Sequence, residues 1–168
     1  MKHTKLAAIL SVACAGALAM GMLGGCASEA TTEEEEAQQA NNEYMSSVNS
    51  IMEELDEELE SFTDAVSRDD VVGMSTQADN AYEVLDELEE LEAPEDLSEI
   101  HEDYLAGADS LEQALDAYVD LYTEIDAAED DEDFDWSTYE DRLAEVQELY
   151  DEGIAQFEAA DTAAAEME

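Results

Sequence analysis

Mostly apolar and aromatic side chains recur at alternating steps of three and four residues through most of this chain. This spacing places them on one face of an α-helix. Four such seams occur: Met45, Val48, Met52, Leu55, Leu59, Phe62 and Val66; Met74, Ala78, Ala81, Leu85 and Leu88; Leu97, His101, Tyr104, Ala108, Leu111, Leu115, Tyr118, Tyr122 and Ile125; Tyr139, Leu143, Val146, Tyr150, Ile154 and Phe157. Strand-like alternation is absent from the sequence. Amphipathic helices with mostly short connections favour antiparallel neighbours, so the pattern predicts an all-α, antiparallel four-helix bundle over residues 44–165.

Local signals place the ends of these helices. Ser67 and Asp70 have the spacing of a helix start, and Pro94 is expected to end the second helix and begin the third, because proline suits a first turn and not an interior. A capping box of the Ser-x-x-Glu type, from Ser137 to Glu140, is predicted to start the fourth helix. The C-terminal tail after the fourth seam, from residue 158 on, is poor in large apolar side chains and is expected to fray.

The N-terminal end has the layout of an export signal. A short basic start precedes an uncharged apolar run at residues 6–22, which is rich in Ala and Gly and at the lower limit for spanning a bilayer. The run ends in Leu23-Gly24-Gly25-Cys26, a branched apolar residue and two small residues before a cysteine. This box resembles the lipobox of bacterial lipoproteins.

The resemblance implies diacylglycerol on the Cys26 sulfur and cleavage between Gly25 and Cys26, with residues 1–25 as the signal peptide. The protein would then be lipid-anchored at the extracytoplasmic face of the cell membrane. Cys14 lies in the segment removed, which leaves the mature chain no free thiol. The stretch after Cys26 lacks an apolar face, so residues 26–43 are predicted to form a lipidated acidic tether, a flexible coil reaching about 20 Å.

Charge limits the possible partners. The mature chain would hold 49 acidic side chains against two arginines, Arg68 and Arg142, a formal net charge of −47. Binding to phosphates needs Lys and Arg, so nucleic acid is excluded as a partner, as is docking of the folded part on anionic lipid. Cations and a basic protein or peptide remain possible partners. The simpler interpretation of the acidic charge is a solvated face that keeps the protein soluble. Arg68 is expected to favour a helix C-terminus, and Arg142 to reach Glu145 one turn on.

The third seam points His101, the mature chain's one histidine, toward the core. No carboxylate lies three or four residues from it, and a di-iron bundle, a covalent haem or a zinc site would need ligands that the sequence lacks. The simpler interpretation of His101 is a buried histidine bonded to a tyrosine or a carbonyl oxygen. Buried phenols need partners for their hydroxyls, and these partners could simply be carboxylates or water. The alternative is a polar pocket for a small aromatic or cationic ligand, lined by His101, Tyr104, Tyr118, Tyr122 and Tyr150.

An acidic loop precedes the fourth helix. Its candidate calcium ligands are Glu129, Asp131, Asp133, Asp135 and Glu140. Phe134 stands where an EF-hand needs glycine, so the loop is not an EF-hand, but weak calcium binding is physically reasonable because clustered carboxylates concentrate cations. The other interpretation is a solvated loop whose Phe134 and Trp136 cover the open end of the core.

Residues 91–122 also resemble the central hairpin of small helical-bundle lipoproteins of unknown function, in which an Ala-Pro corner precedes an inward histidine and a long helix. That resemblance supports the fold and implies no activity. With one histidine, no free thiol and no lysine, the mature chain cannot assemble a nucleophile–base pair, so we expect no enzyme. The sequence predicts a non-enzymatic binding or accessory protein of the cell envelope without a cofactor. The alternative is a small-molecule or divalent-cation binding protein that uses the His/Tyr pocket or the acidic loop.

Overall fold

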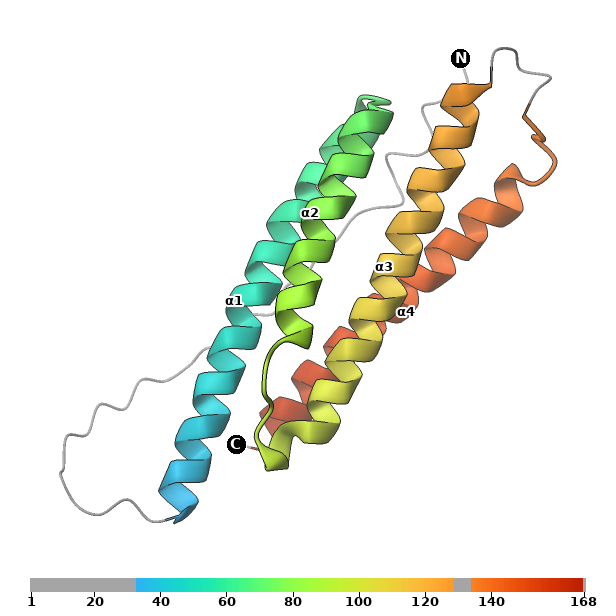
Figure 1. Ribbon diagram of the computed structural model, residues 1–168. Coiled ribbons are helices and arrows are strands. Elements are labelled where there is room, and N and C mark those ends of the chain that lie inside the picture. The colour runs from blue at the N-terminus through green and yellow to red at the C-terminus, as the bar shows by residue number, and fades with distance from the viewer. Residues whose placement is uncertain (1–32, 129–133, 168) are drawn as a thin grey trace.

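The protein is an all-α, antiparallel four-helix bundle, as predicted. A computed structural model describes residues 33–128 and 134–167. Its helices are α1 (Glu33–Ser67), α2 (Val71–Glu89), the short 3₁₀ helix η2 (Glu95–Leu97), α3 (Ser98–Ala127) and α4 (Tyr139–Glu166). The long helices run alternately up and down, and α4 crosses α3 obliquely (Figure 1). No helix in the described ranges has the length and apolar character of a membrane span.

The core lies along the predicted seams of α1, α2 and α3. In α4 only Phe157 of the predicted seam is buried, whereas Leu143, Val146, Tyr150 and Ile154 are half-buried at the edge of the core. Helix α1 packs on α2, α2 on α3, and α3 most extensively on α4. The largest fully buried side chains are Tyr104, Phe62, Leu55, Met74, Leu85, Leu88, Leu97, Leu111, Leu121 and Val48. All buried side chains of the described residues lie between Tyr44 and Ala164, so this span contains the whole described core. The first seam faces slightly differently from the prediction, since Tyr44 is buried and Met45 only half-buried.

The boundaries before α2 and α3 lie where predicted, but Ser67 takes no part in the start of α2. It is the last residue of α1, and its hydroxyl donates to the Asp64 carbonyl oxygen. The Asp70 carboxylate accepts a hydrogen bond from the Gly73 amide at 3.0 Å and so caps α2. Pro94 directly precedes η2, which leads into α3. The capping box at Ser137 is not formed, because the Asp135 carboxylate accepts hydrogen bonds from both the amide and the hydroxyl of Ser137.

Helical structure extends further at both ends than the sequence indicated. The predicted coil of residues 33–43 is the start of α1, where early glutamates suit the positive end of the helix dipole and Gln39 donates a 2.7 Å hydrogen bond to Glu43. The tail does not fray. Helix α4 continues to Glu166, and Ala160 and Ala164 are buried in spite of their size.

Two glycines let α3 and α4 approach closely. A Cβ atom on Gly153 would lie 3.0 Å from the Gly107 carbonyl oxygen and 3.1 Å from the Leu111 amide nitrogen. A Cβ atom on Gly107 would lie 2.7 Å from the Phe157 ring. Both glycines have ordinary helical backbones, so it is contact with the neighbouring helix that requires glycine here.

We expect Gly153→Ala to lower the free energy of unfolding by about 1–3 kcal/mol, because the added methyl group meets rigid backbone atoms of α3. Thr76→Ala, at an exposed position of α2, is the control. It removes only a hydrogen bond to the Val72 carbonyl oxygen of the same helix and should change the free energy of unfolding by no more than about 0.5 kcal/mol. Urea unfolding measures both. A stability gain in Gly153→Ala would show that the two helices can move apart freely.

Candidate functional site

The five residues of the predicted His/Tyr pocket do not meet in one place. His101 and Tyr104 lie near the start of α3, and Tyr118 and Tyr122 near its end. Tyr104 and Tyr118 are fourteen residues apart, which is about 21 Å along a helix. Tyr150 packs against the core from α4 and is only half-buried. The structure therefore contains two separate polar clusters at opposite ends of α3.

In the first cluster the α3 side chains have partners of the predicted kinds, a tyrosine for His101 and a carboxylate for Tyr104. The Tyr44 hydroxyl and His101 Nδ1 form a 2.9 Å hydrogen bond, and the Tyr104 hydroxyl donates to the Asp161 carboxylate of α4. Burial lowers the pKa of His101, with a smaller opposing effect from Glu102. Burial, followed by the bond to Asp161, raises the pKa of Tyr104. All four groups are thus engaged within the protein.

The second cluster consists of three phenols. The rings of Tyr118 and Tyr122 stack with centroids 4.7 Å apart, and the hydroxyls of Tyr122 and Tyr139 lie 3.2 Å apart. Burial raises the pKa of Tyr118 to about 12. Its hydroxyl is buried, and no described atom lies at hydrogen-bond geometry, although the Tyr122 hydroxyl is near enough to affect the pKa. The negative charge of Asp69 acts on all three phenols and further disfavours phenolate.

The acidic loop is described only in part. Glu129, Asp131 and Asp133 lie outside the described residues. The bonds from Ser137 lower the pKa of the Asp135 carboxyl, and Glu140 is exposed in the first turn of α4. No group of three or more His, Cys, Asp or Glu that could hold a metal ion occurs within the described ranges. Calcium binding at this loop stays a prediction.

The two aromatic residues beside the loop behave differently. Phe134 is buried, as predicted, whereas Trp136 is 44% exposed. Trp136 packs edge-on against Phe134, with centroids 4.9 Å apart, and lies against Tyr139. Phe134 is therefore shielded, and Trp136 packs against it from a more exposed position. That the two residues cover the open end of the core stays a prediction.

Carboxylates from two helices converge where α2 faces α3. The acidic face is defined here as Asp86 and Glu89 of α2 with Asp109, Glu112 and Asp116 of α3. Partial burial and repulsion from the other four raise the pKa of Glu112. The described side-chain hydrogen bonds to this face come from two neutral donors. The Tyr82 hydroxyl donates to Asp116 at 3.0 Å, and Gln113 Nε2 donates to Asp109 at 3.0 Å.

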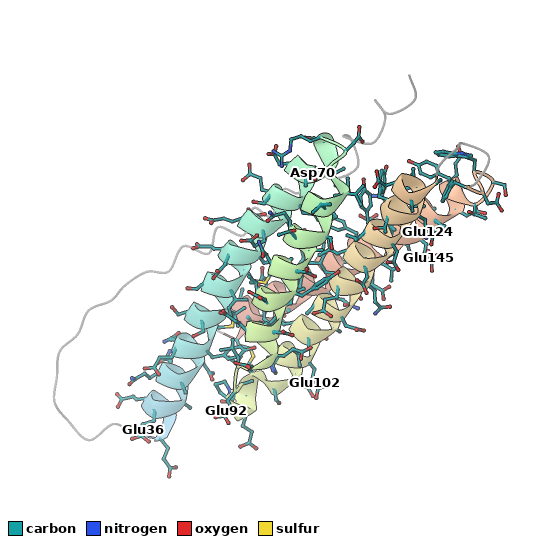
Figure 2. The ribbon with its side chains drawn as sticks, turned by 45° about the horizontal axis from the view of Figure 1, so that its top comes forward. Glu36, Asp70, Glu92, Glu102, Glu124 and Glu145 are labelled. Carbon is teal, nitrogen blue, oxygen red and sulfur yellow. The ribbon has the colours of Figure 1, made fainter. Side chains whose placement is uncertain are left out.

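Both described cations are engaged elsewhere. Arg68 forms an ion pair with Asp64 at 2.8 Å, at the end of α1. Arg142 does not use Glu145 as predicted. It reaches across to Glu124 of α3 with two hydrogen bonds of 2.7 and 3.2 Å, because a carboxylate there allows a bidentate pair. Elsewhere on the four helices, acidic side chains project into solvent (Figure 2).

The sequence predicted the kinds of partner that His101 and Tyr104 have, but it did not identify Tyr44 and Asp161 as those partners, and it did not indicate the acidic face. The predicted first seam begins at Met45 and does not include Tyr44. Asp161 lies in the tail that was expected to fray. The acidic face does have a sequence signal, since Asp109, Glu112 and Asp116 repeat at helical spacing. Comparisons with protein-family models, with characterised proteins and with solved structures find no match to this chain.

The two buried tyrosines should respond oppositely to loss of the hydroxyl. Tyr104→Phe should lower the free energy of unfolding by about 1.5–3 kcal/mol, because the partly buried Asp161 carboxylate loses its donor. Tyr118→Phe removes a buried hydroxyl without a hydrogen-bond partner, so it should be neutral or stabilise by up to about 1 kcal/mol. Chemical unfolding of both variants measures the difference. Equal losses would contradict this assignment of the two clusters.

Proposed function

We propose that this chain is a lipid-anchored, non-enzymatic binding or accessory protein of a bacterial cell envelope, whose acidic face docks a basic protein or peptide. The observation that carries the proposal is the convergence of Asp86, Glu89, Asp109, Glu112 and Asp116 across two helices. Such a surface attracts a basic partner and repels acidic ones.

Two further observations support a binding role. Arg68 and Arg142 are paired with other carboxylates, so neither neutralises the acidic face. Burial, followed by repulsion from the four neighbouring carboxylates, raises the pKa of Glu112, and a basic partner would relieve that repulsion on binding. The Tyr44 phenol that bonds to His101 is buried, and burial raises its pKa to about 12, so it is a poor nucleophile.

The anchor follows from Cys26 and the box before it. Residues 27–32 would connect the lipid to α1, and the first turns of α1 extend past the α2–α3 connection (Figure 1). Residues 33–43 add about 16 Å of helix, at 1.5 Å per residue, in place of a coil. In this proposal the tether is largely a stiff spacer that holds the acidic face away from the membrane surface.

Lipid attachment can be tested with two cysteine variants. Metabolic labelling with an alkyne fatty acid should mark the wild type and Cys14→Ala, because Cys14 lies in the removed segment, and should not mark Cys26→Ala. Mass spectrometry should find the mature chain beginning at residue 26. Label retained in Cys26→Ala, or a different first residue, would rule out this anchor.

Partner docking can be tested with charge-matched variants. Cross-linking in intact envelopes at about 0.15 M salt, where the Debye length is about 8 Å, should capture a basic protein with the wild type. Asp86→Asn/Glu89→Gln/Glu112→Gln, which neutralises the acidic face, should lose this product. Glu53→Gln/Glu57→Gln/Glu60→Gln, with the same charge removed from exposed positions of α1, should keep it. Equal loss in both variants would indicate charge attraction without a defined site.

A further inference from the structure

A surface hollow of about 590 Å³ lies between the first half of α1 and the end of α2. Its size falls within the range of small-molecule sites. Three chemical features meet there: hydroxyl groups, an apolar floor and two carboxylates. The side chains that supply them are Ser46, Ser50, Ile51, Glu87, Glu90 and Leu91.

The walls and floor have different chemistry. Ser47 also lines the hollow, but its hydroxyl donates to the Glu43 carbonyl oxygen of its own helix. The hydroxyls of Ser46 and Ser50 make no hydrogen bond with the described residues, so their lone pairs remain available. Ile51 is buried and Leu91 half-buried, which gives the floor an apolar surface. A ligand that fits would combine hydrogen-bond donors with an aliphatic part.

Electrostatics require the ligand to be a cation. Glu87 and Glu90 stand one turn apart at the end of α2, where the helix dipole is negative and cations are favoured. The last turn of α2 contains no basic residue. Asp86 and Glu89, on the α3 side of the same turn, add to the negative potential. Nothing in this part of the described structure compensates that charge.

The lining favours an organic cation over a metal ion. Calcium takes six to eight oxygen ligands, and this hollow offers only two carboxylates. The described residues contain no metal-binding group of three or more acidic, His or Cys side chains. An apolar floor gives nothing to a hydrated ion but covers methylene groups well. Two carboxylates one turn apart match a chain with an ammonium group near each end.

We propose that this hollow binds a linear aliphatic diammonium ion, with its ammonium groups at Glu87 and Glu90, its N–H groups donating to the Ser46 and Ser50 hydroxyls, and its methylene groups on Ile51 and Leu91. The site lies on the α1 side of α2, whereas the acidic face lies on the α3 side. The inference therefore does not rest on the basic protein partner, and either proposal can fail alone.

The test is a titration of ¹⁵N-labelled residues 27–168 with 1,4-diaminobutane at fixed ionic strength, followed by amide chemical shifts. That segment retains the complete described core. Saturable shifts are expected at Ser46, Ser50, Glu90 and Leu91. Magnesium chloride at matched ionic strength and neutral 1,4-butanediol should not reproduce them.

Variants locate the site. Glu87→Gln/Glu90→Gln should weaken binding about tenfold, since each exposed charge contact contributes up to about a few-fold. The matched control, Glu57→Gln/Glu60→Gln, removes an equally spaced exposed pair from α1 and should bind like the wild type. Ser50→Leu keeps both carboxylates but fills the hollow, and it should abolish the saturable shifts.

Three results would overturn the proposal: no saturable shifts, magnesium shifts at the same amides, or equal weakening in the two glutamine pairs. The first would leave the hollow without this ligand, and the other two would indicate a diffuse counterion atmosphere. The cross-linking variant leaves Glu87 and Glu90 in place, and the glutamine pair tested here leaves the acidic face intact, so the two proposals are tested with different residues.

Discussion

Repulsion between carboxylates is the constraint that determines where the acidic and the apolar side chains of this protein lie. With 49 acidic residues in the sequence and only two arginines in the described part, ion pairs cannot balance the charge. The chain instead keeps its acids on the outer faces of long helices and buries an almost uninterrupted apolar core between them. Apart from the tyrosines, Ser110 is the one polar side chain that the described residues bury. Stability therefore comes from packing, and close approaches such as Gly107 on Gly153 increase it.

Tyrosine donates the hydrogen bonds to carboxylates that lysine and arginine could otherwise donate. A phenol donates a hydrogen bond to a carboxylate without bringing a charge into the core, and it stays neutral because burial raises its pKa. Tyr104 does this for Asp161, and Tyr82 does it for Asp116 at the edge of the acidic face. The tyrosines that looked like a ligand pocket in the sequence are thus mostly the internal polar contacts of a protein that lacks basic residues.

The parts of the structure that could be predicted are those governed by period and charge. Helical spacing located all four helices, and Asp70 and Pro94 fixed two boundaries. What escaped prediction depends on how helices meet: the Gly107–Gly153 approach, the reach of Arg142 to Glu124, and the burial of Tyr44 in place of Met45. Likewise, the α4 tail is ordered because its small residues fit where α3 comes close, which no local propensity reveals. Pairwise contacts of this kind need the crossing geometry, and a single sequence does not contain it.

Helix α2 concentrates the consequences of the charge imbalance. Its last turns hold acids on both sides, against α1 at the hollow and against α3 at the acidic face, while the helix dipole adds further negative potential there. A cation that binds on either side gains binding free energy beyond that of its direct contacts. It also reduces the repulsion between carboxylates that is present in the unliganded bundle. By linkage, any ligand that binds the folded state in this way also stabilises the bundle, by an amount that grows with the logarithm of ligand concentration divided by Kd. In such a protein, the excess of acidic over basic side chains both favours the binding of cations and makes the stability of the fold depend on it.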